Sequence, residues 1–177
     1  YNQGTSRSIY TKGGIFLINK LPGTTLEVSV DNAIAAKEIL DNAFICGGEG
    51  ECFTTVDLME SDLYTGKTSF IKSGAAPSYV KRGSAIFRVK SQTAPLGLLS
   101  SIDAEKIKLE LRPGDYVIML SDGVADETDD AAWLLLLLGE PPRSSLADYA
   151  NLILEEAKRS SKTGDDMTVA VIKIEEA

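Results

Sequence analysis

The order of local patterns along the chain predicts an α+β fold with an antiparallel sheet at its centre. Helical spacings of apolar residues occupy residues 1–46, and short strand-like segments separated by turns occupy residues 52–121. Helical spacings return over residues 125–159, before a final strand at 167–174. Helices on both sides of a strand block are typical of packed α and β layers. We expect residues 1–177 to form a single domain.

Two helices are predicted in the N-terminal region. Over residues 5–21 apolar side chains recur at broadly helical spacings, although each glycine of the Gly13-Gly14 pair weakens a helix by about 1 kcal/mol. Pro22-Gly23 ends this helix, and Ser29 is placed to cap the next one. One face of the second helix carries Ala33, Ala36, Leu40 and Ala43.

The middle of the sequence predicts an antiparallel meander of short strands. The turns expected between these strands are Tyr64-Thr-Gly-Lys67, Lys81-Arg-Gly-Ser84 and Pro113-Gly114. The strands themselves are expected at residues 53–63, 68–73, 78–80, 85–89 and 107–111.

The stretch Asp115-Tyr-Val-Ile-Met-Leu-Ser-Asp-Gly123 carries the strongest functional signal. Its unbroken apolar run is opened by the turn Arg112-Pro-Gly-Asp115 and closed by a glycine, which favours a strand covered on both faces. Asp122 stands at the end of this strand. Because a bare carboxylate in apolar surroundings costs several kcal/mol, Asp122 must be hydrated, hydrogen-bonded or bound to a cation.

Helical patterns return at residues 129–138 and 145–159. Ser145 and Asp148 form a capping-box pattern at the start of the second of these helices. On its apolar stripe, Leu146, Tyr149, Ile153 and Leu154 are expected to be buried against a sheet face. Glu155, Glu156 and Lys158 are expected to face water. The stripe consists of Leu146, Tyr149, Ala150, Ile153, Leu154 and Ala157.

A second acidic site precedes the final strand, at Asp165 and Asp166. If this strand and the strand that ends at Asp122 are antiparallel neighbours, the end of one lies beside the start of the other, and the carboxylates converge. Converging aspartates in a sequence without histidine suit Mg²⁺ or Mn²⁺, which prefer oxygen ligands. The alternative is structural: Asp122 makes an Asx turn with the backbone after Gly123, and Asp165 caps a loop.

Composition excludes several classes of function. A net charge of -8 without a basic stripe argues against nucleic-acid binding, and the absence of histidine excludes Ser-His and Cys-His chemistry. The longest apolar run in the interior is too short to cross a bilayer, and no secretion signal begins the sequence. Cys46 and Cys52 match no zinc spacing and are expected to remain reduced, so we expect a cytoplasmic protein. If the parent protein has a membrane or sensor region, we expect that region to lie outside this chain.

Several separate motifs, in order and at matching spacings, resemble one protein family. They resemble the stage II sporulation protein E branch of the metal-dependent PPM (protein phosphatase 2C-type) serine/threonine phosphatases, over residues from about 53 to 174. The motifs are Phe53-Thr-Thr-Val-Asp-Leu58, Asp62-Leu-Tyr-Thr-Gly66, Gly74-Ala-Ala-Pro-Ser78, Pro95-Leu-Gly97, Pro113-Gly-Asp115 with Ser121-Asp-Gly123, and Gly164-Asp-Asp-Met-Thr168.

The resemblance implies a β-sandwich flanked by helices in α-β-β-α layers, with two Mn²⁺ or Mg²⁺ ions at one end. In the family these ions bridge a water that attacks the phosphorus of a phosphoserine in line. Asp122 and Asp165 match metal ligands of the family and are the expected catalytic residues, acting through that water. Gly123 would permit the close turn beside the cofactor ions. Asp166, Asp126 and Glu127 receive no role from the resemblance.

The sequence also departs from the family, because no Asp-Gly pair precedes Asp122. We therefore expect the C-terminal portion of a PPM domain, weakly active by itself, with unpaired sheet edges that favour a homodimer. The first hypothesis is a phosphatase acting on a phosphoserine protein of the anti-sigma-factor-antagonist type, in bacterial sporulation or stress partner switching. The alternative is a non-catalytic PPM-like domain that binds a regulatory partner, and a third hypothesis is an unrelated α+β domain.

Overall fold

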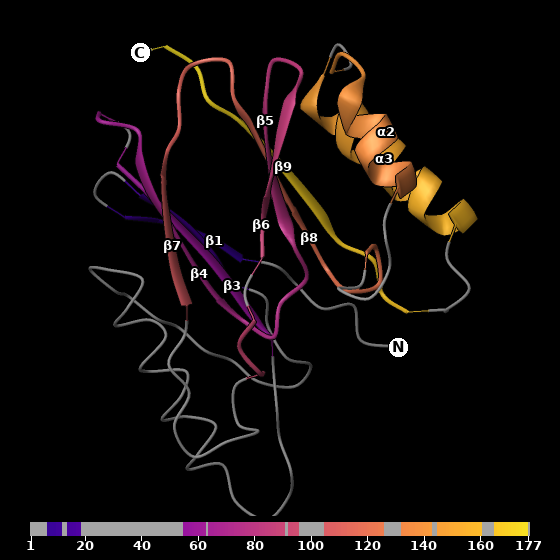
Figure 1. Ribbon diagram of the computed structural model, residues 1–177, viewed down its shortest axis with the longest axis horizontal. Coiled ribbons are helices and arrows are strands. Elements are labelled where there is room, and N and C mark those ends of the chain that lie inside the picture. The colour runs from indigo at the N-terminus through magenta and orange to yellow at the C-terminus, as the bar shows by residue number, and fades with distance from the viewer. Residues whose placement is uncertain are drawn as a thin grey trace, which may run out of the picture. The chain divides into compact units, whose positions relative to one another are not determined.

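The computed structural model describes residues 7–11, 14–18, 55–62, 64–90, 92–95, 105–125, 132–142, 145–160 and 165–176. The chain divides into two compact units (Figure 1). The first consists of Tyr1–Ala75 with Ser91–Glu110, and the second of Ala76–Lys90 with Leu111–Ala177. The described strands all pair antiparallel, and two helices are described as well, so the predicted α+β class is confirmed.

The first unit begins with a β-hairpin and not with the predicted helix over residues 5–21. Strand β1 (Arg7–Thr11) pairs antiparallel with β2 (Gly14–Ile18), and Thr11 lies opposite Gly14. Only Lys12-Gly13 separates the strands in sequence, and the segments are rich in β-branched and aromatic residues. The helix prediction is wrong, because a glycine pair between two short β-prone segments favours a hairpin over a helix. The second predicted helix, which starts at Ser29, lies outside the described residues.

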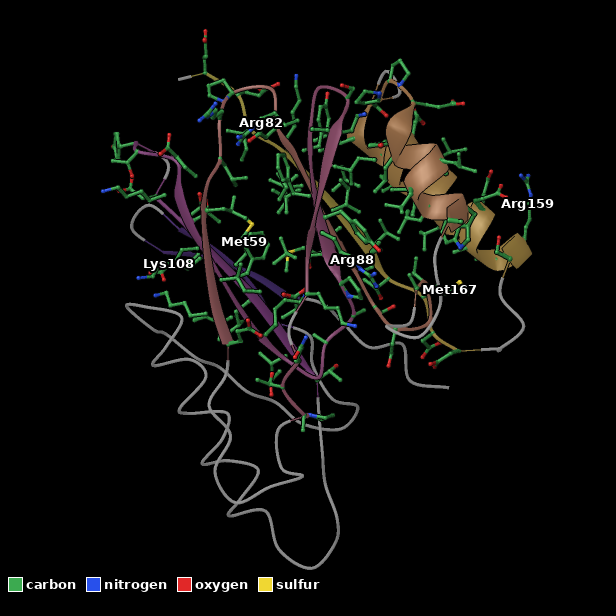
Figure 2. The ribbon with its side chains drawn as sticks, in the orientation of Figure 1. Met59, Arg82, Arg88, Lys108, Arg159 and Met167 are labelled. Atoms are coloured by element: carbon green, nitrogen blue, oxygen red, sulfur yellow. The ribbon has the colours of Figure 1, made fainter. Side chains whose placement is uncertain are left out.

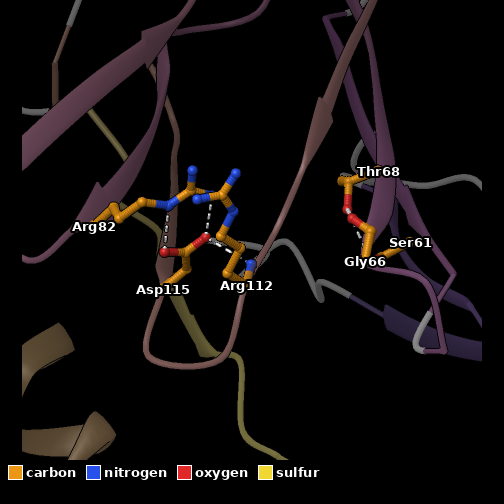
Figure 3. A network of polar contacts seen from close by, with 6 residues as sticks. All are labelled: Ser61, Gly66, Thr68, Arg82, Arg112 and Asp115. Atoms are coloured by element: carbon orange, nitrogen blue, oxygen red, sulfur yellow. Dashed lines mark hydrogen bonds and ion pairs between the residues drawn. The ribbon is translucent and has the colours of Figure 1, made fainter.

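A three-stranded sheet completes the described part of the first unit, in the order β3-β4-β7. Its strands are β3 (Val56–Ser61), β4 (Lys67–Ser73) and β7 (Glu105–Glu110). In the β3–β4 hairpin, the Ser61 and Thr68 hydroxyls form a buried hydrogen bond of 2.8 Å, and Thr68 also donates to the Gly66 carbonyl at 3.0 Å (Figure 3). The predicted hairpin is therefore confirmed.

The Gly74 motif forms a close turn in the same unit. Gly74 has a φ of 57°, and a Cβ atom there would lie 2.6 Å from the Pro95 side chain. Ser73 donates its hydroxyl to the Ala94 carbonyl at 2.7 Å. Only glycine fits this backbone conformation and this approach, so Gly74 has a structural role in packing the turn against Pro95.

The second unit contains a four-stranded sheet in the order β6-β5-β8-β9. Its strands are β5 (Ser78–Arg82), β6 (Ala85–Val89), β8 (Tyr116–Leu120) and β9 (Val169–Lys173). All residues of β8 after Tyr116 are buried, so both faces of this strand are covered, as predicted. The meander prediction is wrong, however, because β7 pairs with β4 and β8 pairs with β5.

Two helices pack on one face of this sheet (Figure 1). Helix α2 (Ala132–Gly139) ends where the buried Lys81 ammonium donates to the Leu138 carbonyl at 2.6 Å. Helix α3 (Leu146–Ser160) begins after Ser145, whose hydroxyl accepts the Asp148 N–H at 3.0 Å and donates to the Asp148 carboxylate at 2.7 Å. The predicted cap is confirmed. In the described part of the chain, neither helix is long and apolar enough to cross a membrane.

The stripe prediction for α3 holds at most of its positions. Tyr149 and Ile153 are buried in the core, and Leu154 packs against it. Leu146 is 40% exposed, contrary to the prediction, because it is the first residue of the helix and lies at its exposed end. Glu156 is half-buried and not fully exposed, and it accepts a hydrogen bond of 3.1 Å from Arg159.

An ion pair holds the turn that precedes β8 (Figure 3). The guanidinium of Arg82 donates to both carboxylate oxygens of Asp115, at 2.9 and 2.6 Å, and the Arg112 N–H donates to the same carboxylate at 2.8 Å. Burial by itself raises the pKa of Asp115. The hydrogen bonds from Arg82 and Arg112 and their positive charges outweigh burial, so the pKa of Asp115 lies below its ordinary value.

Candidate functional site

The end of β8 lies beside the start of β9, as the sequence predicted. Leu120 is paired with Val169 in the antiparallel register, and the ladder continues beyond the strands where Ser121 N–H donates to the Thr168 carbonyl at 3.0 Å. Asp122 follows β8 after Ser121, and Asp165 precedes β9 by a few residues. The two acidic motifs therefore stand at the same end of this strand pair.

The Ser121 side chain joins the two segments. Its hydroxyl accepts the Thr168 N–H at 2.8 Å and donates to the Asp166 carbonyl at 3.2 Å. Between these contacts, Met167 (Figure 2) is partly buried against the core. Asp166 and Thr168 on either side of it are exposed. The segment before β9 is thus held by one apolar side chain and by the polar groups of Ser121.

Gly123 permits a close approach of the two backbones. A Cβ atom at this position would lie 2.4 Å from the Asp166 carbonyl oxygen and 3.4 Å from the Asp165 carbonyl carbon. The first distance is far inside van der Waals contact, and the obstacle is backbone, which cannot rotate away as a flexible side chain can. The close turn expected at Gly123 is present, and its cause is lack of space and not a positive φ.

The carboxylates of Asp122 and Asp165 are both exposed. Each accepts one local hydrogen bond, Asp122 from the Gly123 N–H at 3.1 Å and Asp165 from the Asp166 N–H at 2.8 Å. These contacts agree in part with the structural alternative, in which the carboxylates stabilise local turns. They occupy one oxygen of each carboxylate, and the ion pairs within the described residues include neither group.

Carboxylates that are exposed and have no ion-pair partner among the described residues fit a hard divalent ion. The donor atoms are oxygens, which Mg²⁺ and Mn²⁺ prefer, and an exposed position allows the ion to keep several waters. Among the residues that the structure describes, no three Asp, Glu, Cys or His side chains form a group able to hold a metal. Asp126 and Glu127 lie outside those residues. The visible donors thus fit the ion in kind but make an incomplete set.

The sequence interpretation gave no role to Ser121, whose side chain joins the two segments of this site. It belongs to the Ser-Asp-Gly motif, yet only the aspartate and the glycine received functions. The available signal was the position of a small hydroxyl residue directly after a buried strand, where the chain needs a polar partner for the neighbouring backbone. That signal is weak without knowledge of the segment opposite, which lies more than forty residues further along.

Comparison with known proteins gives consistent matches. The family model for stage II sporulation protein E (SpoIIE) matches residues 27–175. Stage II sporulation protein E of Bacillus subtilis (strain 168) is 32% identical over 163 residues, which are 88% of this chain and 20% of that protein. The Priestia megaterium protein of the same name is 30% identical over 157 residues, 85% of this chain and 26% of that protein. The chain thus spans a fifth to a quarter of these relatives.

Solved structures share the fold. The PP2C phosphatase domain of SpoIIE from Bacillus subtilis, with a fragment of its regulatory domain, matches with a TM-score of 0.69 and 30% identity, covering 82% of this chain and 46% of that one. A serine/threonine phosphatase from S. agalactiae matches with a TM-score of 0.73 at 14% identity, covering 99% of this chain and 94% of that one, which shows the fold alone. The fold, the ordered motifs and the family match agree, and the chain belongs to the stage II sporulation protein E family.

Proposed function

We propose that this chain forms part of a metal-dependent protein serine/threonine phosphatase. The observation that carries the proposal is the position of Asp122 and Asp165 at one end of the β8–β9 pair, in a chain of the SpoIIE family. These are the two aspartates that the family resemblance assigns to metal binding. Their exposure and open oxygens support the assignment.

The proposed cofactor is Mn²⁺ or Mg²⁺, with two ions in the complete domain. When bound, such ions stabilise negative charge on phosphoryl oxygens and lower the pKa of water. The chain's own contribution is to hold the ions through Asp122 and Asp165, while Ser121 and Gly123 fix the backbone between them. Without cations, exposed carboxylates would repel a phosphate dianion, so we expect phosphoserine to bind only together with the metal.

The proposed substrate is phosphoserine on a regulatory protein of the anti-sigma-factor-antagonist type, in sporulation or stress signalling. This part of the proposal follows from the family resemblance. A net charge of -8 also fits a partner that presents basic residues around its phosphoserine, since an acidic surface steers such a partner toward the site.

A metal titration tests the proposal directly. Free Mn²⁺ would be followed by electron paramagnetic resonance as the ion is added to the wild-type chain, Asp122→Asn, Asp165→Asn and Asp166→Asn. We expect the first two variants to lose most Mn²⁺ affinity. Asp166→Asn is the matched control, because it removes the same charge one residue away and keeps the backbone carbonyl that Ser121 contacts. We expect it to retain most of the affinity.

A phosphatase assay on phosphoserine proteins accompanies the titration. Because the sequence has no Asp-Gly pair before Asp122 to add further ligands, we expect weak Mn²⁺ binding and slow turnover by this chain, and tighter binding by a variant to which an upstream Asp-Gly motif is added. Equal affinities for wild type, Asp122→Asn and Asp165→Asn would refute the metal assignment. Retention of a phosphoprotein partner without hydrolysis, at any Mn²⁺ concentration, would instead support a non-catalytic interaction domain.

A further inference from the structure

We infer that Ser121 is a positioning residue for the metal site. Its hydroxyl fixes the Asp165-Asp166 segment against the end of β8, and so sets where the Asp165 carboxylate lies relative to Asp122. The inference rests on the proposed function, because a position for these carboxylates matters only if both hold the same ions. It assigns a role to a side chain that binds neither metal nor substrate.

The hydrogen-bonding capacity of the Ser121 hydroxyl is directed at a single segment. The oxygen accepts the Thr168 N–H at 2.8 Å, and the hydroxyl hydrogen is donated to the Asp166 carbonyl at 3.2 Å. A hydroxyl has one hydrogen to donate. Ser121 therefore uses its donor and an acceptor position on the same segment, the one that carries Asp165. The Ser121 side chain thus forms hydrogen bonds with the segment before β9 on both sides of Met167.

The backbone alone does not provide the same restraint. Strand β9 begins at Val169, and the ladder bond nearest the site is the one from Ser121 N–H to the Thr168 carbonyl at 3.0 Å. Without the hydroxyl, Thr168 would keep this bond, and Met167 would keep its packing. The Asp166 carbonyl, which is part of the residue next to Asp165, would lose its partner within the described residues. Removal of the hydroxyl thus frees the end of the segment that carries the ligand.

Gly123 and Ser121 act on the same carbonyl in complementary ways. The absence of a side chain at Gly123 allows the Asp166 carbonyl to approach, since a Cβ would stand 2.4 Å from its oxygen. The Ser121 hydroxyl then supplies an attraction to that oxygen. Partners that orient a metal ligand typically change metal affinity or activity by about 10- to 100-fold when removed.

The test compares three variants. Ser121→Ala removes the hydroxyl, and Ser121→Thr restores it with one added methyl group. Ser145→Ala is the matched control in the same unit, because the Ser145 hydroxyl also accepts a backbone N–H, at 3.0 Å, and donates to an oxygen, at 2.7 Å. It caps α3, and among the described residues its side-chain hydrogen bonds go to Asp148 and to neither acidic motif. Each variant would be checked by circular dichroism and thermal unfolding before the metal is added.

Three readouts separate positioning from general stability. Exchange of the Thr168 amide hydrogen, measured by nuclear magnetic resonance without metal, reports the hydroxyl contact itself. Mn²⁺ affinity, measured by electron paramagnetic resonance, should weaken about 10- to 100-fold in Ser121→Ala and return close to wild type in Ser121→Thr. Where turnover is measurable, kcat at saturating Mn²⁺ should fall more than the KM for phosphoserine protein rises.

The outcomes are distinct. Faster Thr168 exchange with weaker Mn²⁺ binding in Ser121→Ala, restored by Ser121→Thr and absent in Ser145→Ala, supports the inference. Unchanged Mn²⁺ affinity in Ser121→Ala, or an equal loss in Ser145→Ala, overturns it while leaving the proposed function intact. Wild-type protein that binds no Mn²⁺ overturns the proposed function, and with it the role given to Ser121, although its amide exchange would still report whether the contact exists.

Discussion

Replacing Gly123 by alanine should separate the two acidic segments while leaving the rest of the fold in place. The new methyl carbon would stand 2.4 Å from the Asp166 carbonyl oxygen, whereas ordinary contact begins near 3.4 Å. The carbonyl and the backbone on either side of it must therefore move apart by the difference, about 1 Å. Because Asp122 adjoins Gly123 and Asp165 adjoins Asp166, this displacement falls directly between the two proposed ligands.

Two magnitudes follow from this displacement. Overpacking of a close backbone contact costs about 1–3 kcal/mol in the free energy of unfolding, offset by a smaller gain from the stiffer unfolded chain. A misplacement of about 1 Å in a catalytic site can lower the rate by about 100-fold. We therefore expect a modest loss of stability together with a large loss of Mn²⁺ affinity and turnover.

Gly139→Ala is the matched control for this experiment. A Cβ atom at Gly139 meets nothing within 4 Å, and this glycine does not have a positive φ. Urea unfolding and Mn²⁺ titration of both variants would be compared with wild type. Gly139→Ala should match wild type in both measurements. If Gly123→Ala bound Mn²⁺ as tightly as Gly139→Ala, the close approach would have no part in placing the ligands.

Three further predictions concern stability. Because Ile153 is fully buried, Ile153→Ala should lower the free energy of unfolding by about 2–5 kcal/mol and Ile153→Val by about 0.5–1.5 kcal/mol. Equal losses for the two variants in urea unfolding would contradict tight packing. Thr68→Val should cost about 1 kcal/mol by the same assay, since Ser61 loses a buried partner, and no loss would refute that contact's role. The lowered pKa of Asp115 means that its stabilisation is complete above the unfolded-state pKa of about 3.9 and is lost as pH falls through the folded-state value. Asp115→Asn should therefore unfold less steeply with acid than wild type, and parallel pH profiles would exclude the Arg82 pair as the cause.

Local chemistry made much of the second unit predictable from sequence. The Ser145 cap, the turn before β8 and the buried strand each depend on residues within one short stretch, whose hydrogen-bonding and packing needs can be inferred directly. The placement of the Asp122 and Asp165 segments at the same end of the β8–β9 pair was also predictable, because it required only that two antiparallel strands be neighbours.

The prediction of a helix in place of the N-terminal hairpin was wrong for a physical reason. Five-residue strands have too few residues for helical and strand periodicities to differ clearly, and the apolar residues of 7–18 fit either pattern. The Gly13-Gly14 pair was weighed as a defect in a helix, when glycine next to a two-residue connection is a standard feature of hairpins. Turn chemistry should have outweighed an irregular spacing.

The predicted pairing of strands that are far apart in sequence was wrong for a different reason. Hairpins β3–β4 and β5–β6 are set by local turns, but β7 and β8, which are joined by the short turn through Asp115, belong to different sheets. A tight turn normally indicates paired strands, so the sequence favoured a meander. The choice between partners depends on which long-range contacts bury the most apolar surface, and that comparison involves residues far apart in sequence.

The same distinction separates the parts of the site that sequence reveals from those it does not. Aspartates that follow or precede a strand are visible as exceptions to an apolar pattern, so Asp122 and Asp165 attract attention in the sequence alone. The groups that determine their separation have no such signature: a hydroxyl at Ser121 and a missing side chain at Gly123 act on a carbonyl oxygen of Asp166. A carbonyl is common to all residues, and its function here comes only from its position. A PPM-like chain that kept both aspartates but replaced Ser121 and Gly123 by larger apolar residues should therefore retain the fold and lose the metal site.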